Sequence, residues 1–159
     1  MFSTHLLNIV FSATSVTWTA PPPAWTQTDP NNIRTVDMPV LNGSTQVALR
    51  WSYTLPAGSQ LTSTTFSFAD GSIDNIGTRA IGITTVLDRN DYRTHFNIST
   101  SEMATLIINK VTEREERVYQ CELTTASNSW RYRIRVIATG ESMSKIITVH
   151  LLKAGPPRQ

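Results

Sequence analysis

Apolar and polar residues alternate through most of the chain between residues 33 and 138. From residue 47 to residue 53 every second side chain is apolar: Val47, Leu49, Trp51 and Tyr53. That period of two is typical of a β-strand with one buried face. The same period recurs over residues 105–109, 118–125 and 130–138, and no segment of useful length has a helical period. The pattern predicts an all-β fold.

Turn residues divide this region into short strands of similar length. Strands are also predicted at residues 65–69, 80–87 and 93–99. Gly, Pro, Asn, Asp and Ser are concentrated between the strands, at residues 55–59, 70–71, 88–91 and 126–129. About seven short strands at this spacing predict a sandwich of two sheets, which we expect to span residues 31–138.

The N-terminal end of the chain lacks this alternation. Residues 1–30 are predicted to be a leader and a proline-rich tail, because Pro21, Pro22 and Pro23 favour polyproline II. Trp18 and Trp25 flank the prolines, and we expect them to cover the edge of the adjacent domain. Residues 1–15 hold a short apolar segment, for which a signal peptide and a disordered leader are the alternatives.

The C-terminal end is predicted to be a linker over residues 139–159. Residues 146–152 are apolar and β-branched, so an additional strand is the alternative there. A following domain and a membrane-spanning helix in a longer protein are compatible with such a linker. Within the sequence itself no apolar run reaches the roughly 20 residues that cross a bilayer.

Charge and cysteine content narrow the class of protein. The formal net charge of +2 is too small to indicate a nucleic-acid binder. Cys121 is the single cysteine, so no disulfide can form within the chain. The histidines lie far apart at positions 5, 95 and 150, without metal-ligand spacing. No nucleophile–base pattern, phosphate loop or paired carboxylate motif is present, so we expect no enzymatic activity, no metal and no cofactor.

One motif carries a resemblance to a known family. Tyr119 lies two residues before Cys121 and follows an acidic corner that includes Glu115. Together with Gly43 and the alternating strand that ends near Trp51, this motif resembles a V-type domain of the immunoglobulin superfamily. The resemblance implies that the Tyr119 hydroxyl bonds a backbone group across the turn. It also implies an ion pair between Glu115 and Arg93 at the base of the sandwich.

The chain departs from the family at the disulfide. The family's first cysteine falls on Trp51, which leaves Cys121 without its partner. A disulfide closing a loop of that length would contribute on the order of 4 kcal/mol. A buried indole contributes up to about 5 kcal/mol through its apolar area. We therefore expect Trp51 to pack on a buried, unreactive Cys121 thiol in place of the disulfide.

Two further features concern location and partners. Asn42 and Asn97 each begin an Asn-X-Ser glycosylation sequence, which favours an extracellular or cell-surface glycoprotein, either secreted or part of a membrane protein. Arg131, Arg133 and Arg135 alternate with apolar residues and so share the outer face of the last strand. Glu122 is expected opposite them, either in simple cross-strand pairs or as part of a partner-binding face.

The resemblance implies an extracellular recognition module that makes protein–protein contacts in cell-surface adhesion or in self and non-self recognition. The partner would be homophilic or heterophilic, and a sulfated glycan is an alternative ligand for a row of arginines. Two other functions stay open. One is the ligand-binding ectodomain of a signalling receptor of the receptor tyrosine kinase type, and the other is a secreted immune-type binding protein.

Overall fold

The structure is a computed structural model that describes residues 14–82, 86–87 and 89–140. Its elements in chain order are β1 (Val16–Ala20), β2 (Trp25–Gln27), β3 (Thr35–Leu41), β4 (Thr45–Arg50), β5 (Ser52–Thr54), β6 (Leu61–Phe68), β7 (Asp74–Ala80), β8 (Val86–Leu87), α1 (Tyr92–His95), β9 (Phe96–Ile98), β10 (Thr105–Lys110), the 3₁₀ turn η1 (Glu113–Glu115), β11 (Val118–Thr125) and β12 (Ser129–Thr139).

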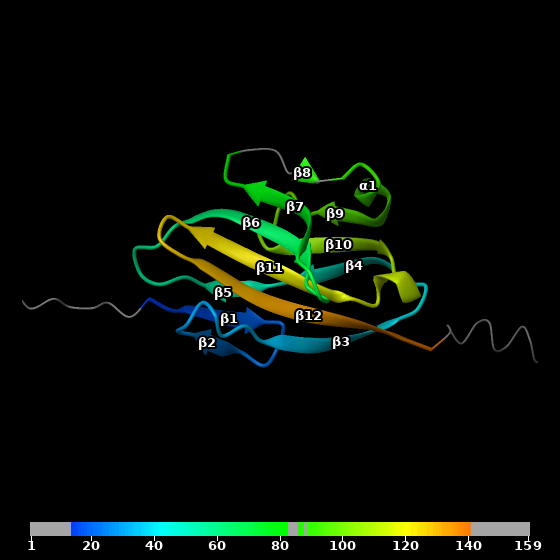
Figure 1. Ribbon diagram of the computed structural model, residues 1–159, viewed down its shortest axis with the longest axis horizontal. Helices are drawn as coiled ribbons and strands as arrows, with labels where there is room; N and C mark the ends of the chain where they lie inside the picture. Colours follow the sequence, from blue (N-terminus) through cyan, green and yellow to red (C-terminus); the bar gives the residue numbers. More distant parts are fainter. Residues whose placement is uncertain (1–13, 83–85, 88, 141–159) are drawn as a thin grey trace, which may run out of the picture.

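The strands form one large sheet and two small ones (Figure 1). The large sheet has six strands in the order β3-β12-β11-β6-β7-β8, and β3 runs parallel to β12 while the other neighbours are antiparallel. A three-stranded sheet has the order β4-β10-β9. The third sheet has the order β2-β1-β5, and β5 follows β4 after the single residue Trp51.

The alternating apolar residues of both layers meet in one core. Leu49, Leu106 and Ile108 of the three-stranded sheet are fully buried, as are Phe66, Tyr119, Cys121, Leu123 and Ile134 of the six-stranded sheet. The strands β7 and β8 extend the β6-β11-β12 sheet, which is the V-type arrangement. The predicted all-β sandwich is confirmed, and its fold is that of a V-type immunoglobulin-like domain.

The N-terminal segment differs from the sequence-based expectation. Residues 16–27 form the β1–β2 hairpin, and β1 pairs with β5. Trp18 and Trp25 are buried in the common core, where both rings contact Tyr132. The Trp18 indole N–H donates to Gln27 Oε1 at 2.9 Å, so this buried N–H group has a hydrogen-bond partner. The prolines form the hairpin loop rather than a tail, and the expected domain boundary at residue 31 falls within the fold.

Two predicted strands are also shorter than expected. The strand expected at 80–87 is interrupted, because β7 ends at Ala80 and a turn with Gly82 at φ +74° follows. The strand expected at 93–99 begins only at Phe96, after the helical turn α1. This turn brings the Tyr92 and Phe96 rings into edge-to-face contact, with centroids 5.8 Å apart. The predicted leader up to residue 13 and the linker from residue 141 lie outside the described residues.

Candidate functional site

The corner before β11 has the geometry that the Tyr119 motif implies. Tyr119 is fully buried, and its hydroxyl donates to the backbone carbonyl of Glu115 at 2.9 Å. Burial raises the pKa of Tyr119 far above its usual value, so the hydroxyl keeps its proton. This hydrogen bond closes the turn between η1 and β11, and its role is structural.

Glu115 is held by a different set of partners from those expected. Its Oε2 accepts from the backbone N–H of Thr112 at 2.9 Å and from the Thr112 hydroxyl at 2.5 Å. Its Oε1 lies 3.3 Å from Nδ1 of His95. The expected Arg93–Glu115 ion pair is not formed, because α1 places His95 beside the carboxylate and leaves Arg93 exposed. Glu115 is thus a buried cap of the turn.

The ion pair at this end of the sandwich joins Asp70 and Arg117, which the sequence analysis missed. Arg117 donates two parallel hydrogen bonds to the Asp70 carboxylate, at 2.8 and 3.0 Å. The guanidinium carbon lies 3.6 Å from the ring centroid of Phe68. The hydrogen bonds from Arg117 lower the pKa of Asp70. The pair joins the β6–β7 turn to the residue before β11. In the sequence, only an Asp-Gly turn and an arginine near Tyr119 could have indicated it.

The centre of the core shows how the chain is built without a disulfide. Trp51 is 3% exposed and Cys121 is fully buried as a free thiol. The Trp51 ring packs against Phe66 with centroids 5.9 Å apart, and Phe66 lies opposite Cys121 in the sheet register. Burial raises the pKa of the Cys121 thiol well above its usual value. A neutral, enclosed thiol is a poor nucleophile, so this site supports packing rather than chemistry.

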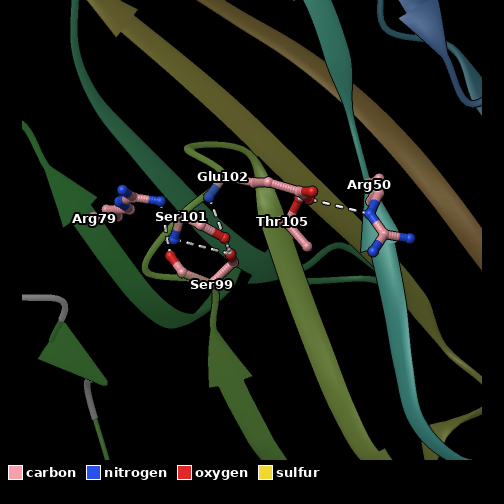
Figure 2. A network of polar contacts seen from close by, with 6 residues as sticks. All are labelled: Arg50, Arg79, Ser99, Ser101, Glu102 and Thr105. Carbon is pink, nitrogen blue, oxygen red and sulfur yellow. Dashed lines mark hydrogen bonds and ion pairs between the residues drawn. The ribbon is translucent and has the colours of Figure 1, made fainter.

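A polar network joins the two layers at the β9–β10 turn (Figure 2). Arg79 of β7 donates to the carbonyl oxygens of Ser99 and Thr100 at 2.8 and 2.7 Å. The Glu102 carboxylate accepts from the Thr105 hydroxyl at 2.8 Å and from Arg50 at 3.0 Å. A cavity of about 380 Å³ lies beside this network, next to β5. Because Arg79 bonds two backbone carbonyls and Arg50 pairs with Glu102, the network braces the loop and offers little free bonding capacity.

The arginine row is the most distinctive surface feature. Arg131, Arg133 and Arg135 all lie on the outer face of the six-stranded sheet, opposite the buried residues of β12. Each guanidinium has a fixed partner on a neighbouring strand. Arg131 bonds Glu122 at 2.5 Å, Arg133 bonds Gln120 Oε1 at 2.9 Å, and Arg135 bonds Asp37 at 3.1 Å. The expected cross-strand pairing with Glu122 is thus present, and the row also contacts Gln120 and, through Asp37, the neighbouring strand β3.

The rest of this outer face is built from uncharged polar residues. Thr65 of β6 and Thr78 of β7 are opposite each other, with their hydroxyls 3.2 Å apart. Gln120 and Ser67 are 3% and 2% exposed although they point away from the core. Neighbouring side chains such as Arg133 thus already shield the centre of the face from water. We call this outer surface of β12, β11, β6 and β7 the arginine face.

Other kinds of site lack support in the part of the chain that the structure describes. No group of three or more His, Cys, Asp or Glu side chains there is arranged to hold a metal ion. Within the same residues no helix has the length and apolar character needed to cross a membrane.

Comparison with known proteins finds solved structures of low sequence identity. No family model matches the chain, and no curated protein matches it. Among solved structures, murine CRIg is similar at 17% identity with a TM-score of 0.47, covering 65% of this chain and 92% of that one. A chain from a structure concerning T cell specificity and activation by the bacterial superantigen toxic shock syndrome toxin-1 is 13% identical. That match has a TM-score of 0.49 and covers 78% of this chain and 99% of the other.

Proposed function

We propose that the chain is an extracellular recognition module that contacts another protein through the arginine face. The observation that carries this proposal is the fixed geometry of the three arginines before any partner is bound. Each is held by a cross-strand hydrogen bond of 2.5 to 3.1 Å. Side chains that are already ordered lose less conformational entropy on binding, and Arg is enriched at the centres of protein interfaces.

Charge balance favours a protein partner over a sulfated glycan. The three guanidinium groups of the row face two carboxylates, those of Glu122 and Asp37. The remaining charge is small, and each cation has part of its bonding capacity already in use. A polyanion would have to compete with these carboxylates, whereas a protein surface can match positive and negative groups together. The same balance suits both a homophilic and a heterophilic contact.

The proposed location is the cell surface or the extracellular medium. It is supported by the V-type immunoglobulin-like fold together with the two Asn-X-Ser sequences in the described part of the chain. The fold reaches a closed core without a disulfide, so oxidation is not required for folding.

The direct experiment inserts a glycan into the middle of the arginine face. Thr65→Asn creates the sequence Asn-Phe-Ser on β6 with one substitution and no change of charge. In protein secreted from cultured cells, we expect this variant to lose self-association, measured by sedimentation, and to lose adhesion of chain-coated beads to a panel of cultured cells. Thr65→Gln is the matched control, because it lacks the acceptor for a glycan.

A charge reversal provides an independent test of the same face. We expect Arg133→Glu to abolish the same association while the far-ultraviolet circular dichroism spectrum stays that of a β-sandwich. If wild type, Thr65→Asn and Arg133→Glu associate and adhere equally, the arginine face is not the contact surface.

A further inference from the structure

The two Asn-X-Ser sequences occupy different structural environments. Asn97 is in β9, an edge strand of the β4-β10-β9 sheet. Its neighbours Phe96 and Ile98 are buried, so Asn97 points to the outer face, where it is exposed. Asn42 is in the turn between β3 and β4 and is half-buried.

Asn97 can carry a substituent without losing its contact to the sheet. Its Nδ2 donates one hydrogen bond, to Asn109 Oδ1 at 2.9 Å. A primary amide has two N–H groups, and N-linked substitution leaves one of them in place. Asn109 also accepts from Gln46 at 3.2 Å and donates to the Thr94 carbonyl at 3.0 Å, so Asn109 is held by contacts in addition to the one with Asn97.

The surface next to Asn97 suits the apolar face of a sugar ring. The sheet register places Asn97 opposite Ile107 and Ile107 opposite Ala48, in one row across the outer face. Ile107 and Ala48 are half-buried, so apolar area remains open to solvent there. A sugar attached at Asn97 would lie over this row.

The turn at Asn42 is held by three backbone hydrogen bonds. Asn42 N–H donates to the Thr139 carbonyl at 3.1 Å, and Gly43 N–H donates to the Val111 carbonyl at 2.8 Å. Ser44 N–H donates back to the Leu41 carbonyl at 3.1 Å, and Gly43 has a φ of +86° that favours glycine. The Asn42 side chain is half-buried at this turn, whereas Asn97 is exposed, so a substituent on Asn42 would have less open space around its point of attachment.

We propose that Asn97 is N-glycosylated, that Asn42 is not, and that the glycan covers the outer face of the β4-β10-β9 sheet. The reaction joins Asn97 Nδ2 to the anomeric carbon of a lipid-pyrophosphate-linked oligosaccharide. The bond from that carbon to the pyrophosphate breaks, the lipid pyrophosphate leaves, and a base of the transferase takes the Nδ2 proton. The proposal rests on the extracellular location proposed above, and it leaves the arginine face as the uncovered outer surface.

The test expresses the full chain behind an added, cleavable secretion signal in cultured human cells. Peptide N-glycosidase treatment in heavy-oxygen water converts each modified asparagine to a labelled aspartate, which mass spectrometry locates. We expect the label at position 97 and not at position 42, in both the secreted and the cell-associated fractions. Asn97→Gln should remove the glycan mobility shift, whereas Asn42→Gln and Ser99→Thr should leave it unchanged.

Label at position 42, or its absence at position 97, would overturn the proposal. Because the signal is supplied, this result does not depend on the protein's natural location. Loss of the arginine-face contact would instead appear in the association assay, where we expect Asn97→Gln to behave as wild type. The failure of the glycan site and the failure of the recognition function are thus observed separately.

Discussion

The two outer faces of the sandwich present different chemistry on strands of the same kind. The arginine face carries guanidinium groups joined to carboxylates, as in the Arg131–Glu122 pair. The outer face of the β4-β10-β9 sheet has the Arg50–Glu102 pair at one end, and its row through Asn97 instead carries neutral amides at Gln46, Asn97 and Asn109, joined in one ladder. Both rows are ordered by cross-strand hydrogen bonds, so they differ in charge rather than in rigidity. One sheet therefore suits contact with a charged protein surface, and the other suits a covering glycan.

The largest expected effect comes from the core that both faces share. Trp51→Ala removes a nearly fully buried indole, which should lower the free energy of unfolding by about 3–5 kcal/mol. Because both faces rest on this core, the substitution should destabilise them together. Urea unfolding followed by fluorescence and circular dichroism measures this change. Trp51→Phe is the matched control and should lose much less, and a loss below about 1 kcal/mol for Trp51→Ala would show that the indole does not replace the disulfide.

The core also shows which contacts can be predicted from sequence. The Tyr119 hydrogen bond joins residues four apart, so a short motif is enough to predict it. The burial of Trp18 depends on β1 pairing with β5, which is far along the chain and leaves no local signal. The prolines between Trp18 and Trp25 suggested an extended tail because their conformational preference is strong, yet they occupy a hairpin loop. Local patterns thus predicted the all-β sandwich, and distant pairing decided where it begins.

In the candidate sites, too, local sequence patterns predicted some contacts, while others depend on pairing between distant strands. Alternation alone placed Arg131, Arg133 and Arg135 on one face, because a strand has a strict period of two. The partner of Glu115 was missed because α1 interrupts that period and brings His95 rather than Arg93 to the carboxylate. Asp37 could not be assigned to Arg135, since a parallel pairing between β3 and β12 has no short sequence signature.

A smaller effect is expected when the amide ladder is broken. Asn109→Ala removes the acceptor for Gln46 and Asn97 and the donor to the Thr94 carbonyl. Because these groups are partly solvated, we expect a loss of about 1 kcal/mol in the free energy of unfolding. The groups are neutral, so the loss should be the same at low and high salt. A loss that falls strongly with added salt would mean that charge, rather than amide bonding, orders this face.

The corresponding substitution on the arginine face should cause a smaller loss of stability, and that loss should depend on salt. Arg131→Ala removes a partly exposed ion pair with Glu122, for which we expect a loss below about 1 kcal/mol. Added salt screens such a pair, so the difference from wild type should shrink between about 0.01 and 1 M ionic strength. Urea unfolding at the two salt concentrations measures it. Equal salt responses of Arg131→Ala and Asn109→Ala would remove the distinction between the two faces.

The smallest expected effect is a pH-dependent loss of stability at Asp70, which lies at the end of the six-stranded sheet. Hydrogen bonds from Arg117 lower the pKa of Asp70 below its ordinary value of 3.8, so the folded state favours the ionised carboxylate. The resulting stability is fully present above that ordinary value and is lost as the pH falls through the lowered pKa. Asp70 is about one-third exposed, which keeps the contribution below about 1 kcal/mol. Asp70→Asn should therefore be slightly less stable than wild type at neutral pH, and the difference should disappear in acid.

Glu102→Gln is the control on the other sheet. Hydrogen bonds from Thr105 and then Arg50 lower the pKa of the Glu102 carboxylate, which is more exposed than that of Asp70. The loss of stability in Glu102→Gln should therefore have the same sign and a smaller size. Thermal unfolding of the three proteins from about pH 2 to about pH 7 measures both differences, and a constant gap between Asp70→Asn and wild type across that range would rule out ionisation of Asp70 as its source.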